Sequence, residues 1–290
     1  MHPADVRVRA IGPTTGLPEP LARALDPTPF VPLPSPGPAD WLASHPEPGQ
    51  GYVEFVASRP PRPDARRRRI DLLPLGRLAS GPPLERFRDY ATTFYGLPSR
   101  LLPALDAAAL SPTSRINPQT GRRQLFTPEI LDALAGRIDS GAFCLAALTL
   151  EDLYPDPAWN FVFGQASLSE RVGVYSLARY DPAFYGEARG PGWQQTVLRR
   201  GLNVMVHELG HMLGFAHCVF FRCVMNGSNH LDEADARPMQ LCPVCLRKLH
   251  HSIPFDPLAR YRGLEAYYRG AGLGAEAERV AALAARIARP

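Results

Sequence analysis

The stretch from His207 to His217 reads HELGHMLGFAH and decides the fold of the chain. On a helix, His207 and His211 project from the same side because they are four residues apart. Glu208 follows the first histidine, where its carboxylate can reach a water molecule on a shared metal ion. Gly214 permits a left-handed turn that ends the helix and lets His217 return toward the other two histidines. The spacing predicts three histidine ligands and one open position, as in catalytic zinc sites.

The length of this pattern weighs against coincidence. With this composition, HExxH alone would arise in roughly one chain in a hundred, and HExxHxxGxxH in roughly two in a hundred thousand. A lone helical histidine is more often packed or solvated than a ligand. The longer pattern favours a metal site, with Glu208 as the general base.

Four of the five cysteines lie after this histidine motif, between positions 218 and 245. Cys218 and Cys223 form C-x4-C, and Cys242 and Cys245 form C-x2-C. Two such pairs can fill the shell of one tetrahedral ion, which leaves no room for water and makes the site structural. Two disulfides are the alternative, but they need an oxidising compartment, and residues 1–10 lack the apolar core of a signal peptide. We therefore expect a second zinc ion and a cytoplasmic location.

One peptide bond joins His217 to Cys218, so their Cα atoms can be only about 3.8 Å apart. A structural zinc would thus fix the loop that carries His217 and Met225. Cys144 lies in an apolar run, and we expect it to be a buried, small hydrophobic residue. The sequence predicts two zinc ions per chain, one catalytic and one structural.

The combined pattern of HExxHxxGxxH, a cysteine directly after it, C-x-M and a later C-x2-C resembles that of the archaemetzincins, zinc metallopeptidases of the metzincin group. Residues 225–249, MNGSNHLDEADARPMQLCPVCLRKL, resemble the eukaryotic-type members in particular. A weaker likeness extends over about residues 70–250. The sixteen residues between Met225 and Cys242 are one fewer than the family pattern usually has.

The resemblance implies a role for each matched residue. Met225 would form the Met-turn beneath the site, and Glu208 would be the catalytic base. The implied ligands of the catalytic zinc are His207, His211 and His217, and those of the second zinc are Cys218, Cys223, Cys242 and Cys245.

Composition narrows the classes of protein. The 290 residues are 45% hydrophobic, without an apolar stretch long enough to span a membrane. The net charge is +4. The run Arg66–Arg69 could bind nucleic acid, but four arginines before an apolar run are more often a solvated face. We expect a peptide or protein substrate and neither a nucleic-acid nor a membrane partner.

Three parts are expected along the chain. Residues 1–66 form a Pro-rich N-terminal extension with fifteen of the thirty-two prolines, residues 67–253 the catalytic domain with the second zinc site, and residues 254–290 a helical tail. The extension should be loop-rich. Part of it should cover the catalytic domain through Phe30, Trp41, Leu42, Tyr52 and Phe55, although a mobile tail is the alternative.

The apolar patterns alternate between strand and helix, which predicts an α/β (α+β) fold. Strands are expected near residues 68–75, 100–105, 142–150, 160–164 and 171–178. Helices are expected near 84–95, near 128–138 with Thr127 as N-cap, over about twenty residues after Pro191, and over 275–288. The resemblance implies a metzincin-like mixed sheet with a backing helix and an active-site helix, above an irregular zinc-bound lower subdomain.

The family's edge strand binds substrate as an added antiparallel strand, and residues 160–164 are the expected counterpart. An ordinary buried strand is the alternative. The predicted function is zinc-dependent hydrolysis of peptide bonds, with Glu208 acting on a zinc-activated water. A zinc-dependent binding protein with little or no peptidase activity is the alternative, and a hydrolase of some other amide is a third possibility.

Overall fold

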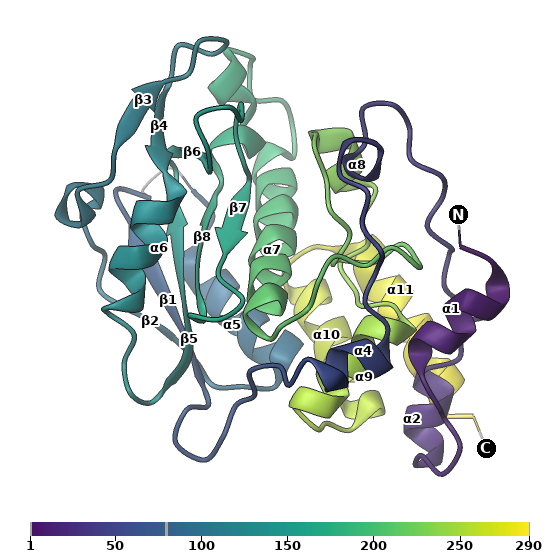
Figure 1. Ribbon diagram of the computed structural model, residues 1–290. Helices are drawn as coiled ribbons and strands as arrows, with labels where there is room; N and C mark the ends of the chain where they lie inside the picture. Colours follow the sequence, from purple (N-terminus) through teal and green to yellow (C-terminus); the bar gives the residue numbers. More distant parts are fainter. Residues whose placement is uncertain (1, 79–80, 290) are drawn as a thin grey trace. The chain divides into compact units, whose positions relative to one another are not determined.

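The computed structural model describes residues 2–78 and 81–289 (Figure 1). The chain divides into two compact units. We call residues 63–92 and 97–212 the sheet unit, and residues 1–62, 93–96 and 213–290 the helical unit. The predicted three-part division of the chain stays a prediction.

A five-stranded mixed sheet organises the sheet unit. Its strand order is β2-β1-β5-β8-β7, and β7 is the antiparallel member at one edge. The central strands are near-continuous apolar runs because both faces of a parallel sheet are covered. The strands are β1 (Arg69–Leu75), β2 (Ser99–Leu101), β5 (Ala142–Thr149), β7 (Gly164–Ala166) and β8 (Val172–Ser176).

Helices cover both faces of this sheet. Alternation along β8 directs Val172 and Val174 into a core shared with α6 (Thr127–Ala135). The intervening Gly173 faces Met212 at the end of α7 (Trp193–Met212), and α7 lies on the other side of β8 from α6 (Figure 1). Helix α5 (Leu84–Tyr95) shares the α7 side, since Phe87 lies against Gly201. Helix α7 is the predicted active-site helix, and the mixed α/β fold is confirmed.

A smaller sheet and short helical turns complete the sheet unit. The small sheet has the order β3-β4-β6, with β3–β4 antiparallel and β4–β6 parallel. The bounds are β3 (Ser114–Ile116), β4 (Arg123–Phe126), β6 (Asp152–Tyr154), η1 (Ala107–Leu110), η2 (Ala178–Tyr180) and η3 (Pro182–Tyr185).

Two local predictions in the sheet unit were wrong. Residues 160–164 do not form a strand: Val162 makes one isolated bridge with Leu153, and β7 begins at Gly164, where a strand end had been expected. Thr127 is not an N-cap but the first residue of α6, and Phe126 occupies the cap position. The Thr127 hydroxyl instead donates to the carbonyl of Tyr154, so a partner on β6 displaces the local cap.

The helical unit contains two groups of packed helices. In one, α4 (Tyr52–Ala57) and α1 (Ala4–Ile11) pack on α9 (Pro243–Ser252); in the other, α10 (Pro257–Gly270) pairs with α11 (Gly274–Ile287). The predicted tail helix at 275–288 corresponds to α11. The other helices are α2 (Glu19–Ala24), α3 (Trp41–Ser44) and α8 (Leu231–Asp235).

The Pro-rich extension is less loop-like than expected, because it contains α1 to α4. Proline at the first turn explains part of this, since its fixed φ suits a helix start, as at Pro20 in α2. Phe55 is fully buried and packs edge-on against Phe215, with ring centroids 5.3 Å apart. The extension therefore packs on residues of the 213–290 segment. Among the described residues, no helix is long and apolar enough to cross a membrane.

Candidate metal centres

Helix α7 presents the first two histidines on one side. His207 is buried, His211 is partly buried, and their Nε2 atoms lie 3.0 Å apart with the rings nearly perpendicular at 85°. Two imidazole nitrogens on one tetrahedral zinc would be about 3.3 Å apart at normal zinc–nitrogen distances. The pair therefore fits a shared metal ion.

Glu208 lies against the edge strand of the sheet. Its side chain is buried, and β7 passes directly over it at Gly164. A Cβ atom added to Gly164 would lie 2.6 Å from Oε1 of Glu208 and 2.9 Å from its Cδ. Only a glycine lets the strand approach the carboxylate this closely, so the position of Glu208 against β7 depends on Gly164.

The chain turns after α7 as the sequence predicts. Gly214 has a φ of +83°, in the left-handed region that favours glycine. Its Cα faces Pro60, whose Cβ would lie 2.8 Å from an added Cβ. His217 follows three residues later. It belongs to the helical unit, whereas His207 and His211 belong to the sheet unit.

The imidazole of His217 has partners that the sequence did not reveal. Its Nδ1 lies 2.7 Å from Oε1 of Glu47, a residue of the Pro-rich extension. The Trp41 ring packs edge-on against it, with centroids 5.1 Å apart. These contacts join residues about 170 positions apart, and no local pattern marks Glu47 as a site residue.

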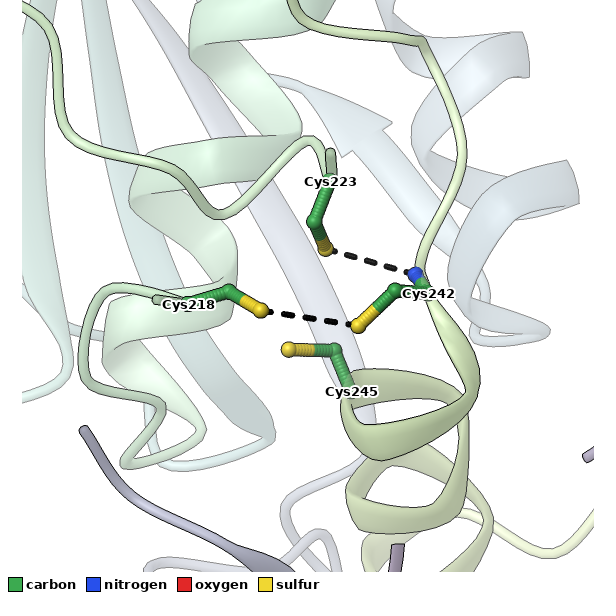
Figure 2. A group of neighbouring side chains, drawn as sticks. All are labelled: Cys218, Cys223, Cys242 and Cys245. Atoms are coloured by element: carbon green, nitrogen blue, oxygen red, sulfur yellow. Dashed lines mark hydrogen bonds between the residues drawn. The ribbon is translucent and has the colours of Figure 1, made fainter. Parts of the chain in front are cut away.

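The four predicted cysteines converge in one buried cluster (Figure 2). Cys218 and Cys223 come from the loop after α7, whereas Cys242 is the N-cap of α9 and Cys245 lies in its first turn. Cys218 Sγ and Cys242 Sγ are 3.5 Å apart, and all four cysteines are free. A disulfide needs about 2.05 Å, whereas two thiolates on one zinc lie about 3.8 Å apart. The spacing fits a metal ion and excludes disulfides here.

The pKa shifts of the clustered thiols also favour binding of a cation. Hydrogen bonds from the other thiols, that of Cys223 first, hold the pKa of Cys218 well below its ordinary value. Burial raises the pKa of Cys242 well above it. The site therefore favours one thiolate but resists several, and a shared cation would remove that conflict.

Asn226 braces the loop that carries the first two thiols, and the sequence analysis missed it. Its Oδ1 accepts from the backbone N–H of Cys223 at 2.7 Å, and its Nδ2 donates to the carbonyl of Cys218 at 2.6 Å. Met225 is fully buried, and its carbonyl accepts from the N–H of Cys218 at 2.8 Å. Cys144 is a free, buried thiol, and burial raises its pKa.

A third group joins Asp40, His230 and Glu233 in the helical unit. His230 Nδ1 accepts from the N–H of Glu233 at 3.3 Å, so its Nε2 donates to Asp40 Oδ1 at 3.1 Å. The Glu233 carboxylate accepts from the N–H groups of Trp41 and Asn229. These hydrogen bonds explain the group without a cation.

Comparisons with known proteins point to one peptidase family. Residues 135–251 match the model of peptidase family M54. Rat archaemetzincin-2 is 40% identical over 195 residues, which cover 59% of this chain and 54% of the relative. Mouse archaemetzincin-1 is 38% identical over 218 residues, 66% of this chain and 43% of the relative. The resemblance to the archaemetzincins is confirmed.

Two solved structures support the fold. The archaemetzincin of Methanopyrus kandleri has a TM-score of 0.50 and 28% identity, covering 67% of this chain and 99% of its own. A zinc-dependent peptidase from Methanocorpusculum labreanum also has a TM-score of 0.50, at 21% identity, covering 62% of this chain and 99% of its own. The chain spans about half the length of the archaemetzincins it matches in sequence.

Proposed function

We propose that this chain is a zinc-dependent metallopeptidase, with His207, His211 and His217 as ligands of the catalytic zinc. The observation that carries the proposal is the pair of facing Nε2 atoms, 3.0 Å apart, beside a buried glutamate on the same helix. Three neutral imidazoles leave zinc most of its charge. The bound ion would supply a Lewis acid that lowers the pKa of water to about 7.

The remaining chemistry belongs to the chain. In the proposed mechanism, the Glu208 carboxylate accepts the proton of the attacking water and later donates it to the departing amine. Burial favours this role, since a carboxylate in a water-poor site exchanges protons with the substrate rather than with solvent. Such proton transfer contributes typically about 10²- to 10⁴-fold in rate.

The edge strand β7 is the proposed guide for substrate. Its position at the end of the sheet order leaves one side for a further strand. Gly164 brings that edge against Glu208, so an extended peptide paired with β7 would pass close to the base. The substrate is thus proposed to be a peptide or protein segment in extended form.

The cysteine cluster is proposed to hold a second, structural zinc. Four buried Sγ atoms, two from the loop after α7 and two from the start of α9, offer a complete tetrahedral shell without an open position. Free thiols of this kind persist in a reducing compartment, which supports a cytoplasmic location. Met225 is proposed as the Met-turn, held by its backbone contact with Cys218.

Metal content and hydrolysis test the proposal together. The parent protein should contain two zinc ions per chain and cleave peptides in a chelator-sensitive way. Glu208→Ala should keep both ions and lose about 10²-fold or more of the rate. His211→Ala should lose one ion. Zinc binding without hydrolysis of any peptide, with free or blocked N-terminus, would instead favour the zinc-dependent binding protein.

A further inference from the structure

Glu47 contacts the third histidine through the Nδ1 nitrogen of its imidazole. Its Oε1 lies 2.7 Å from Nδ1 of His217, within the range of a charge-assisted hydrogen bond. Both side chains are mostly buried, at 24% and 18% exposed. This contact is therefore less screened by solvent than a surface ion pair.

The hydrogen bond selects one form of the imidazole. A neutral histidine has one N–H donor and one acceptor nitrogen. A carboxylate only accepts, so Glu47 requires the proton of His217 to be on Nδ1 and leaves the Nε2 lone pair for a metal ion. A carboxylate hydrogen-bonded to the second nitrogen of a ligating imidazole also fixes the orientation of the ring.

Glu47 is itself held in place by Trp41. The indole Nε1 donates to the same Oε1 atom at 2.7 Å, and the backbone N–H of Trp41 donates to Glu233 at 3.0 Å. Gly227 lies flat against the indole, because an added Cβ would be only 2.4 Å from its Cδ1. Two donors thus meet on one oxygen, and the tryptophan that provides one of them is anchored independently.

The segment around Glu47 is fastened to the loop of His217 at a further point. Gln50 donates from Nε2 to the carbonyl of Gly214 at 3.2 Å, and its Oε1 accepts from the N–H of Ala216 at 3.1 Å. The same oxygen accepts from Nζ of the buried Lys248 at 2.9 Å. Residues 41–50 therefore follow the loop between α7 and the third histidine.

We propose that Glu47 is a positioning residue for His217, so that the Pro-rich extension is a working part of the catalytic zinc centre. The proposal rests on the proposed function, because it assumes that His217 is a zinc ligand. The carboxylate acts through the orientation and tautomer of the imidazole rather than by contact with substrate. Loss of an outer partner of this kind typically weakens metal binding about 10- to 100-fold.

The test measures zinc affinity at the histidine site by competition with a chelator, on the full chain with the cysteine site loaded. Glu47→Ala should bind this zinc about 10- to 100-fold more weakly than the parent. Glu47→Gln keeps the shape and an acceptor oxygen but loses the charge, and it should fall between the two. Glu54→Gln is the matched control: an exposed glutamate of the same extension, expected to leave the affinity unchanged.

Peptide hydrolysis at two zinc levels separates positioning from a general fault in folding. At low free zinc, Glu47→Ala should lose activity, and excess zinc should restore most of it; a misfolded variant would not recover. Gly227→Ala, which displaces Trp41, should weaken zinc binding in the same direction without altering Glu47.

Two outcomes have different meanings. If the parent binds zinc and cleaves peptide while both Glu47 variants keep the parent's affinity, the positioning role is overturned and the proposed function stands. If the parent holds no zinc at the histidines, the proposed function itself falls, and the role of Glu47 with it.

Discussion

Replacing Gly164 by alanine should damage catalysis while sparing metal and fold. The added Cβ would lie 2.6 Å from Oε1 of Glu208, about 0.9 Å inside van der Waals contact. It would also lie 2.9 Å from Cδ and Cγ, so the whole carboxylate must shift rather than only its tip. A misplacement of about 1 Å can cost about 10²-fold in rate, equivalent to about 2.7 kcal/mol of transition-state stabilisation.

The assay is kcat/KM on a fluorogenic peptide, with zinc content and thermal unfolding measured on the same samples. Gly136→Ala is the matched control, because its φ of −73° suits alanine and, among the described residues beyond its chain neighbours, an added Cβ would meet one carbonyl oxygen, that of Ala133 at 3.8 Å, within 4 Å. Glu208→Ala sets the lower limit of the rate. If Gly164→Ala, fully loaded with zinc, cleaves peptide as fast as the Gly136→Ala control, the reasoning fails, and Glu208 is either freely mobile or not the base.

The remaining predictions concern metal content and stability. In Cys242→Ser, the cysteine cluster should lose its zinc ion while the zinc at the histidines remains, which elemental analysis checks. The free energy of unfolding should fall by several kcal/mol, on the order of one ligand's share of the binding free energy of a structural zinc, which urea unfolding checks. Asp152→Ala should destabilise by about 3–5 kcal/mol, because it leaves the buried Arg179 guanidinium without its bidentate partner. A urea midpoint like that of the parent would contradict this. The hydrogen bond from Arg189 lowers the pKa of Asp181 in the folded state. The contribution of this pair to stability is therefore present above the unfolded-state pKa of Asp181 and is lost as the pH falls through its lower folded-state pKa. Asp181→Asn should therefore reduce the acid sensitivity of unfolding below about pH 4, by less than about 1 kcal/mol because the pair is partly exposed; an unchanged pH profile would count against it.

Sequence reasoning worked where the deciding interactions are local. The helical period of the segment before Gly214 and the left-handed turn at that glycine both depend on neighbours within a few residues. The run 142–150 is apolar because both faces of its strand are covered, and it appears as β5. The spacing of the first two histidines was equally predictive, since helix geometry alone brings His207 beside His211.

Prediction failed where distant partners compete with local preference. Residues 160–164 contain the aromatic and β-branched residues of a strand. The Phe161 ring instead lies under the Arg179 guanidinium, whose Cζ is 3.7 Å from the centroid of the ring. Thr127 stands at the start of a helix like a cap, yet its hydroxyl is used by Tyr154. Glu47 could not be recognised at all, because only the folded chain brings it to His217.

The adjacency of His217 and Cys218 limits where this chain can change in length. One inserted residue between them would move one potential ligand by about 3.8 Å, whereas metal–ligand distances tolerate only about 0.2 Å. The segment 226–241 carries α8 and contains none of the proposed zinc ligands, which are His207, His211, His217 and the four cysteines. Insertions and deletions should therefore be rejected between residues 207 and 225, and tolerated within 226–241 only away from Asn226, Gly227 and Glu233, whose contacts support the two sites. A shortening of one residue between Met225 and Cys242, the departure from the family pattern seen in this sequence, falls where the two sites can absorb it.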